Sequence, residues 1–473
     1  MTLGTWTDLV DLLAIIGFII ALKGLSSPRH ARRGNALGAA AAVVAIGMTF
    51  SNPSLRSAGI GDIVNHKLNV ILIIIAMVIG TAIAVPVARL VKMTAMPQMV
   101  AIFNGVGGGA AALVSVTELL KFPSADVAVY KIGEVLFGVL VGCVSFSGSA
   151  IAFAKLQELM TGRPVTYPGQ QQVNALLGIV ILGLAIAALA TGHIVFVYLL
   201  LVLSLVLGAA FVLPIGGADV PVLISLLNSF TGLAVAASGF TLDNNLLIVA
   251  GTLVGASGIL LTRLMSSAMG RSLPNILFSA FGSVITADAD AQVASGKTVK
   301  SGTADDIGVL LAYARKVAIV PGYGLAVAQA QHAVKELADD LTSRGVEVYY
   351  AIHPVAGRMP GHMNVLLAEA NVPYEQLKEM DEANPEMQTT DVALVVGAND
   401  TVNPAARNSP GSPIYGMPII NVDQAQNVIF LKRSMRPGFA GIDNELLYDP
   451  KTTMLFGDAK DSLTKLDQAV TVA

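Results

Sequence analysis

The chain has 473 residues, of which 54% are hydrophobic and only 13% are charged. Soluble globular proteins average about 25% charged residues, so the composition indicates an integral membrane protein, long enough for a multi-spanning bundle and one further domain. The formal net charge is −3 and the basic residues are scattered, which gives no reason to expect nucleic-acid binding. The single cysteine, Cys143, excludes an internal disulfide and any site built from paired cysteines.

Apolar runs long enough to cross a bilayer dominate the first part of the chain. A transmembrane helix needs about 20 apolar residues. No basic stretch precedes the first run, so we expect that run to be retained rather than cleaved as a signal peptide. We expect nine spans, near residues 8–25, 35–50, 68–90, 96–120, 127–154, 173–192, 194–213, 219–240 and 244–265.

Basic residues are concentrated in alternate connections between these spans. Because basic loops stay on the cytoplasmic side of a membrane, this pattern predicts an N-terminus outside and a C-terminal domain in the cytoplasm. The basic residues that carry the argument are Lys23, Arg29, Arg32, Arg33, Arg89, Lys92, Lys155, Arg163, Arg263 and Arg271.

Several of the expected spans are rich in small residues, notably Asn104–Ser115, Ser145–Ala152 and Gly251–Gly258. Small residues let helices approach closely in lipid, where packing drives their association, so they predict a tight bundle. Gly105–Ala110 formally matches the dinucleotide pattern GxGxxA. No strand precedes it, and we do not expect it to bind a nucleotide.

Polar side chains at membrane depth are costly and are therefore candidate functional residues. The candidates are Asn104, Glu134, Ser145, Ser147, Ser149, Asp219 and Asn228. Glu134 and Asp219 could instead lie at solvated helix ends and have no functional role. Asn104 and Asn228 could line a pathway for protons or ions. Alternatively, their amides could hold two helices together by hydrogen bonds. None of the six histidines falls centrally in an expected span, which excludes heme ligation within the bundle.

The composition changes after the ninth span. Residues 271–305 are polar and rich in Ala, Ser, Gly and Asp, and we expect them to form a linker or hinge between a transmembrane domain (1–270) and a cytoplasmic domain (306–473). In the latter, helices and strands alternate, which predicts a Rossmann-like α/β fold with a parallel sheet that binds ligands at the carboxyl ends of its strands. We expect helices at 306–316, 325–345, 363–371 and 458–470, and strands at 317–322, 346–354, 391–400, 418–422 and 427–435.

The segment Ile319–His332 has the pattern of a strand, a glycine turn and the start of a helix. Gly322 is expected to permit the tight turn and Gly324 to let the backbone approach a pyrophosphate, while the helix amides near Leu325 face the anion. Val327 occupies the third glycine position, so the match to the dinucleotide fingerprint is incomplete.

The type of dinucleotide is predicted from the strands that follow. When NAD binds, an acidic residue normally ends the second strand, but here that strand ends at Ile352–His353 without a carboxylate. Lys432, Arg433 and Ser434 follow a later strand and offer two cations and a hydroxyl to a 2′-phosphate. These residues favour NADP(H); a charged surface loop is the alternative.

Three further strand-end segments could line a ligand crevice: His353–Arg358, Gly361–Asn364 and Gly397–Asn403. In the last of them Gly397, Asn399 and Asp400 are candidate binding residues, and Asp400 either acts as a titrating switch or caps a turn. The sequence contains no evident Ser-His-Asp or Cys-His nucleophile pattern and no flavin or iron–sulfur motif. Any chemistry would therefore be the hydride transfer of the nicotinamide itself.

Long motifs in the chain resemble those of the proton-translocating NAD(P) transhydrogenases. PGYGLAVAQAQ, IHPVAGRMPGHMNVLLAEA, VVGANDTVNPAA, KRSM and MLFGDAK resemble the NADP(H)-binding domain of that family, and GGADVPVLISLLNSFTG resembles the membrane part of its beta subunit. The resemblance covers essentially the whole chain. It implies a multi-pass subunit of the cell inner membrane that exchanges hydride between its NADP(H) and NAD(H) on a partner alpha subunit, in a dimer of alpha–beta units. Inward proton flow would drive NADPH formation from NADH.

The resemblance also implies roles for individual residues. Those implied to contact the dinucleotide are Gly322, Tyr323, Gly324, Ala326 and Val327, with Val355, Ala356, Gly357 and Arg358 near the nicotinamide and Lys432, Arg433 and Ser434 at the 2′-phosphate. Asp400 would couple protonation to nucleotide binding, Asn228 would line the proton channel, and Asp219 would form its cytoplasmic end.

Asn104 departs from the family pattern, because many members carry a membrane histidine at this position. The resemblance then implies that the proton is carried by another helix, by a partner helix, or by water and amides. Two functions from other classes stay open: an NADP(H)-sensing channel or transporter, and a membrane reductase that feeds a metal or quinone.

Overall fold

The structure, a computed structural model, describes residues 3–26, 28–51, 63–92, 95–121, 129–157, 159–160, 165–216, 219–268, 272–278, 298–357, 361–409, 412, 414–438 and 440–473. The candidate Arg358 and most of the expected linker, residues 279–297, lie outside these ranges.

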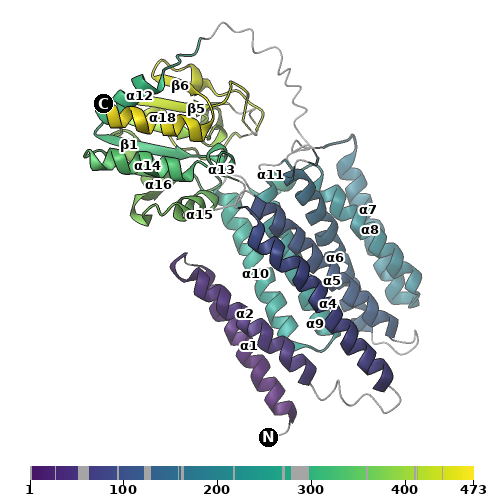
Figure 1. Cartoon of the computed structure of the whole chain (residues 1–473). Coiled ribbons are helices and arrows are strands. Elements are labelled where there is room, and N and C mark those ends of the chain that lie inside the picture. The colour runs from purple at the N-terminus through teal and green to yellow at the C-terminus, as the bar shows by residue number, and fades with distance from the viewer. Residues whose placement is uncertain are drawn as a thin grey trace.

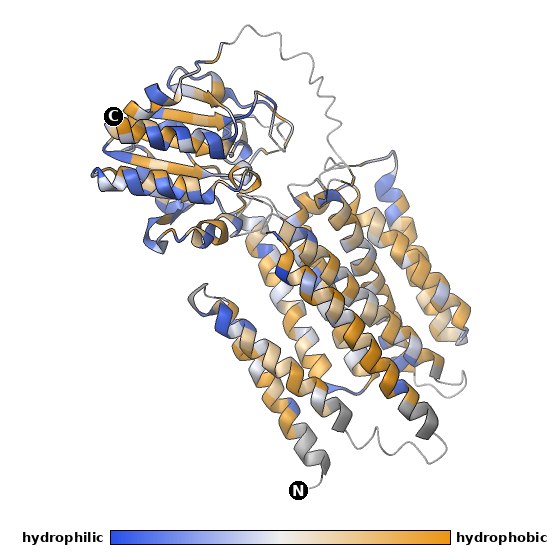
Figure 2. Ribbon diagram, viewed as in Figure 1, coloured by the Kyte–Doolittle hydropathy of each residue, from blue (hydrophilic) through white to orange (hydrophobic). Residues whose placement is uncertain are grey.

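Nine long helices fill the described residues of the N-terminal part (Figure 1), and they correspond in order to the nine expected spans. They are α1 (Leu3–Leu25), α2 (Pro28–Ser51), α4 (Ile63–Leu90), α5 (Met96–Lys121), α6 (Val129–Leu156), α7 (Gln170–Thr191), α8 (Ile194–Val212), α9 (Val220–Thr241) and α10 (Asn245–Ala268). Seven of them, α4 to α10, are long and apolar enough to cross a membrane. Figure 2 shows apolar residues over the outer faces of the bundle, as lipid contact requires.

Helices α5, α6 and α9 form the centre of the bundle and pack on one another. Buried residues make up 72% of the apolar window of α9 and 0% of that of α4. Small residues permit the close approaches: a Cβ on Gly142 would lie 2.6 Å from the Gly108 carbonyl oxygen, and one on Gly232 would lie 2.5 Å from the Gly255 amide nitrogen. Gly105–Ala110 therefore lies within a packed helix, α5, and not in a nucleotide-binding turn.

The C-terminal domain contains a parallel sheet of six strands in the order β3-β2-β1-β4-β5-β6. The strands are β1 (Lys316–Pro321), β2 (Glu347–Ile352), β3 (Leu377–Glu379), β4 (Val392–Val396), β5 (Asn427–Lys432) and β6 (Thr452–Phe456). Every residue of β4 is buried, as expected for a parallel sheet covered on both faces. The order reverses between β1 and β4, and this point positions the candidate site.

Helices cover both faces of the sheet (Figure 1). One apolar cluster lies beneath α12 (Ala304–Ala312), α13 (Tyr323–Val327), α14 (Gln331–Ser343), α15 (His362–Glu369) and α18 (Ala459–Val472). The other lies beneath α16 (Met380–Met387) and the short 3₁₀ turns η7 (Val422–Gln424) and η8 (Glu445–Tyr448). The Rossmann-like α/β prediction is confirmed.

Some predicted elements are corrected by the structure. The helix expected at 325–345 is two helices, α13 and α14, because Gln329 adopts φ 50° and interrupts them. The strand expected at 418–422 does not form: the Ile420 amide donates to Thr401 and the Asn421 amide to the Asn384 side chain, so this segment has no strand partner. Strands β3 and β6 and helix α16 were not predicted.

Both ends of the expected linker form backbone hydrogen bonds. Helix α11 (Leu273–Phe278) follows the bundle. At the other end, Lys300 accepts a hydrogen bond from the Met454 amide and Gly302 donates one to the Met454 carbonyl, so this stretch runs along the edge of β6.

Candidate functional site

The loops after β1 and β4 meet at the reversal of strand order, where open α/β sheets bind ligands. The Gly322 amide donates to the Val396 carbonyl and the Gly324 amide to the Gly397 carbonyl, both at 2.9 Å. A Cβ on Gly322 would lie 2.4 Å from the Ala398 Cα. Glycine is therefore required here for the contact between the two loops.

The glycine turn thus differs in detail from the expected phosphate-binding turn. Because the amides of Gly322 and Gly324 donate within the protein, a pyrophosphate would be met by other amides of the two loops. Helix α13 has only five residues, so its dipole at this turn is small. Val327 is 45% exposed while Ala326 is buried; valine at the third glycine position therefore does not obstruct the packing of the helix on the sheet.

The loop after β2 is held by a buried histidine. The His353 Nδ1 accepts a hydrogen bond from the Val355 amide at 3.2 Å, and Nε2 lies 2.7 Å from the Pro418 carbonyl oxygen. Burial lowers the pKa of His353 to about 4, so the ring is neutral at physiological pH. Ala356 is buried, and Gly357 adopts φ +102°, where a Cβ would lie 2.4 Å from His362. The loop therefore has a fixed conformation beside Tyr323, whose ring centroid is 6.4 Å from that of His362.

A pair of cations lies at the carboxyl end of β5. The Lys432 Nζ donates to the Asn399 Oδ1 and to the Arg436 carbonyl oxygen, both at 3.2 Å. Burial lowers the pKa of Lys432, and the nearby Asp400 and Asp443 carboxylates oppose this shift. Arg433 is exposed.

The exposed Arg433 has a carboxylate within reach. Its guanidinium lies 3.5 Å from the Asp458 carboxylate, and the two side chains are 62% and 41% exposed. An exposed ion pair of this kind is weak. Arg433 can therefore turn to an anionic ligand at little cost.

Asp400 ties the segment after β5 to the loop after β4. Its Oδ2 accepts from the Ala440 amide at 2.8 Å, and its Oδ1 accepts from the Asn399 side chain at 3.0 Å. Gly438 packs against both side chains, since a Cβ there would lie 2.5 Å from Asp400. The carboxylate therefore does more than cap its own turn: it holds the segment that begins with Arg433.

The donor set at this edge fits a 2′-phosphorylated dinucleotide. It combines two cations after β5 with a close glycine contact between the loops after β1 and β4. The second strand, β2, is followed by a neutral buried imidazole and not by the carboxylate expected of an NAD site. Lys432, Arg433 and Ser434, the residues predicted to hold the phosphate, all lie at the end of β5. Among the described residues, no group of His, Cys, Asp and Glu could hold a metal ion.

The membrane candidates form a separate cluster at the contact of α5, α6 and α9. The Asn104 Nδ2 donates to the Ser149 Oγ at 2.9 Å and to the Ser145 Oγ at 3.3 Å. The hydroxyl oxygens of Ser145 and Thr231 lie 2.6 Å apart, and the Thr231 hydroxyl donates to the backbone carbonyl oxygen of Asn104. The buried Asn104 Oδ1 has no hydrogen-bond partner among the described residues, so one acceptor in this cluster is available to water or a proton donor.

Two further membrane candidates lie on α9. Asn228 is half-buried on α9, and Asp219 is buried at the first turn of that helix. The structure therefore joins Asn104 to serines and a threonine but does not join it to Asn228 by a hydrogen bond within the described part of the chain.

Lys155 caps the end of a helix near Asp219. Its Nζ lies 2.5 Å from the Leu213 carbonyl oxygen and 2.7 Å from that of Ile215, at the C-terminal end of α8, and Lys155 is only 2% exposed. A cation is favourable at this end of a helix. Lys155 thereby fixes the turn that leads to Asp219.

Val355 connects the two parts of the molecule. It packs against Val222, Met265 and Ile276 of α9, α10 and α11, and also against a cluster of the α/β domain that includes Ile419. The loop after β2 therefore contacts the helical bundle directly.

Three residues with contacts at these sites were missed by sequence reasoning: Thr231, Lys155 and Ala440. Thr231 lies one helical turn after Asn228, so helical spacing could have found it. Lys155 was used only for orientation. The role of Ala440 depends on a backbone amide, for which a sequence carries no signal.

Comparisons with known proteins match nearly the whole chain. A family model described as NAD(P) transhydrogenase beta subunit matches residues 7–469. Two relatives from Rhodospirillum rubrum, one of them from a specified strain, are both named NAD(P) transhydrogenase subunit beta. Each is 48% identical over 470 residues, which cover 97% of this chain and 98% of the relative. The match therefore includes both the helical bundle and the α/β domain.

Proposed function

Because the chain belongs to the NAD(P) transhydrogenase beta-subunit family, we propose that its α/β domain binds NADP(H) and exchanges hydride with NAD(H) on a partner alpha subunit. The chain spans a membrane through its apolar helices. In the proposal the N-terminus lies outside and the α/β domain lies in the cytoplasm, and two alpha–beta units form a dimer in the cell inner membrane.

The observation that carries the proposal is the position of Lys432 and Arg433 at the carboxyl end of β5, in a sheet whose β2 ends without a carboxylate. Two cations there compensate the charge of a 2′-phosphate, and Ser434 adds a hydroxyl. The glycine loops after β1 and β4 would lie along the dinucleotide. The bound nicotinamide supplies the hydride chemistry, while this chain orients it through Val355, Ala356 and Gly357 and excludes water.

The partner is proposed because hydride exchange needs a second nucleotide. The described residues contain one sheet with one reversal of strand order, and so one dinucleotide crevice. NAD(H) would then be held by the alpha subunit.

Proton coupling is proposed through the polar cluster of the bundle. Asn104, Ser145, Ser149 and Thr231 form a connected set of donors and acceptors between three packed helices, with one acceptor left open. Asn228 and Asp219 would extend the route along α9. The contact of Val355 with the bundle gives a path by which a change among these helices alters the nucleotide loop. Asp400, which holds the segment after β5, would couple this change to nucleotide binding. Inward proton flow would then favour NADPH formation.

The test is hydride exchange by the assembled alpha–beta complex in vesicles. NADPH should reduce an NAD analogue only when the alpha subunit is present, with proton movement in the same preparation. A sensing channel would bind NADPH and exchange no hydride. A reductase that feeds a metal or quinone would show a flavin or heme absorption band in the purified protein.

A further inference from the structure

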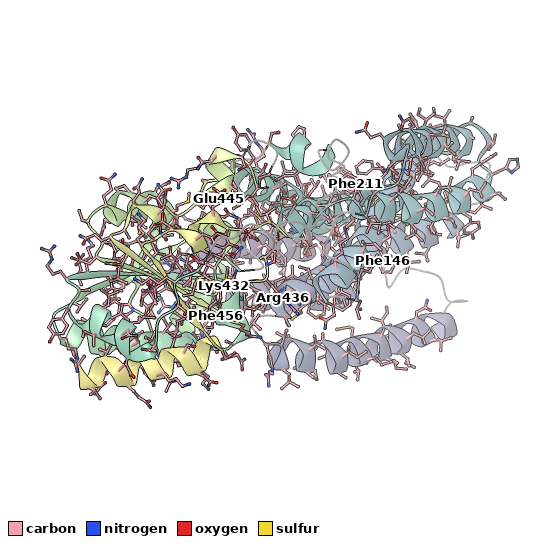
Figure 3. The ribbon with its side chains drawn as sticks, turned by 90° about the horizontal axis from the view of Figure 1, so that it is seen from above. Phe146, Phe211, Lys432, Arg436, Glu445 and Phe456 are labelled. Carbon is pink, nitrogen blue, oxygen red and sulfur yellow. The ribbon has the colours of Figure 1, made fainter. Side chains whose placement is uncertain are left out.

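An aromatic side chain lies beside the proposed 2′-phosphate site. Phe456 is the last residue of β6 and pairs in register with Lys432, the last residue of β5. Side chains alternate across a sheet, and Met454 and Phe430 lie in the same apolar cluster. Phe456 and Lys432, two residues further along each strand, therefore project from that same face. Figure 3 shows Phe456 and Lys432 close together, with Arg436 nearby.

Phe456 is exposed at the end of its strand. It is 43% exposed, whereas Met454 and Phe430 on the same face are fully buried. The backbone after it is fixed: the Gly457 amide donates to the Lys432 carbonyl at 3.0 Å, and the Asp458 side chain caps α18 by accepting from the Lys460 amide. A half-exposed ring on such a rigid support can receive a flat ligand group without ordering the chain.

We propose that Phe456 is the platform on which the adenine of the dinucleotide stacks. The inference rests on the proposed NADP(H) site. In that nucleotide the purine and the 2′-phosphate are carried by adjacent ribose carbons. A phosphate held by Lys432 and Arg433 therefore leaves the purine beside the neighbouring strand end, about 4.8 Å away across the sheet, where Phe456 lies. Aromatic rings stack on any base, so Phe456 adds affinity, while the cations select the 2′-phosphate.

The test measures binding of adenosine 2′-monophosphate and of inorganic phosphate to the full-length alpha–beta complex by calorimetry. Phe456→Ala and Phe456→Leu should weaken the nucleotide about tenfold, the range expected for one base stacked on one ring, and should leave phosphate binding unchanged. Phe456→Tyr and Phe456→Trp should retain the affinity. The matched control is Tyr374→Ala, because Tyr374 is similarly exposed (47%) but precedes β3 at the opposite edge of the sheet.

Trp6 is the only tryptophan in the chain, which permits a spectroscopic signature of stacking. In a Trp6→Phe background, the fluorescence of Phe456→Trp should be quenched by adenosine 2′-monophosphate and not by phosphate. An unquenched tryptophan at saturating nucleotide would overturn the proposal.

The outcomes separate this inference from the function on which it rests. If the double variant Lys432→Ala, Arg433→Ala binds both ligands as tightly as the wild type, the assignment of the NADP(H) site is wrong. If those changes weaken both ligands while Phe456→Ala weakens neither, the site stands and the adenine platform is wrong. Loss of hydride exchange in Phe456→Ala with unchanged nucleotide binding would instead assign the ring to the contact with the alpha subunit.

Discussion

The Nε2 of His353 donates a hydrogen bond to the Pro418 carbonyl oxygen across 2.7 Å, while its Nδ1 accepts from the Val355 amide. The ring thereby joins the end of β2 to the segment before η7, which has no strand partner. The same loop reaches the bundle through Val355. One neutral imidazole therefore fixes the backbone at the junction between the nucleotide site and the membrane helices.

The stability of this junction should decrease in acid. Burial lowers the pKa of folded His353 from 6.5 to about 4, so between these values the unfolded chain binds a proton that the folded ring does not, and stability falls as the pH falls through that window. The loss should reach a few kcal/mol near pH 4. Amide hydrogen exchange of residues 346–357 in the full-length protein measures it. His353→Gln should flatten the dependence; an equally steep dependence in that variant would assign the effect to other groups.

Asp400 should control how long NADPH stays bound. Its carboxylate accepts from both Ala440 and Asn399, and Asp400→Asn replaces one acceptor by a donor. The segment that carries Arg433 should then open more often, and NADPH should dissociate about tenfold faster, as measured by stopped-flow displacement. Asp461→Asn, an exposed carboxylate on α18, is the control. Equal dissociation rates for Asp400→Asn and the wild type would show that Asp400 does not control NADPH release.

Asn104 should be needed for proton movement. Asn104→Ala removes the donor to Ser145 and Ser149 and the open acceptor, so we expect proton translocation in vesicles to fall about tenfold while NADPH affinity stays the same. Asn104→His, which restores a proton-binding group, should recover part of the loss. Ser257→Ala on α10 is the control, since Ser257 is exposed and bonds only within its own helix. Undiminished pumping in Asn104→Ala and Asn228→Ala together would mean that the route runs elsewhere.

Packing of α9 on α10 should be intolerant of a single methyl group. A Cβ on Gly232 would lie 2.5 Å from the Gly255 backbone nitrogen, whereas one on Gly178 of α7 meets nothing within 4 Å. Gly232→Ala should therefore lower the free energy of unfolding of the detergent-solubilised protein by about 1–3 kcal/mol, seen as a lower melting temperature. Gly178→Ala should not lower it. Comparable melting curves for the two variants would show that the helices can separate at no cost.

Much of the architecture could be predicted because the signals are local. Each span is a continuous apolar run, and α9 and α10 begin within one or two residues of the expected positions. The parallel sheet followed from alternating helices and strands. The resemblance to the transhydrogenase beta subunits is confirmed by the match over residues 7–469.

The elements that were missed depend on tertiary contacts. The segment 418–422 has the composition of a strand, but its amides find other acceptors, and His353 holds it from the side. The break at Gln329 divides a continuous helical pattern. Pairing of β6 with β5 brings Phe456 to Lys432, and no local pattern could indicate that neighbour. The roles of the site residues stay predictions until ligand binding is measured.

The most direct test of the central claim is a titration of the full-length alpha–beta complex, with the NAD(H) site of the alpha subunit saturated, by NADPH and by NADH. The wild type should bind NADPH at this site at least about 100-fold more tightly than NADH. Lys432→Ala combined with Arg433→Ala should abolish the difference, and Lys465→Ala, an exposed cation on α18, should preserve it. Equal affinity of the wild type for the two nucleotides, or an unchanged preference in the double variant, would contradict the assignment of this edge of the sheet to NADP(H).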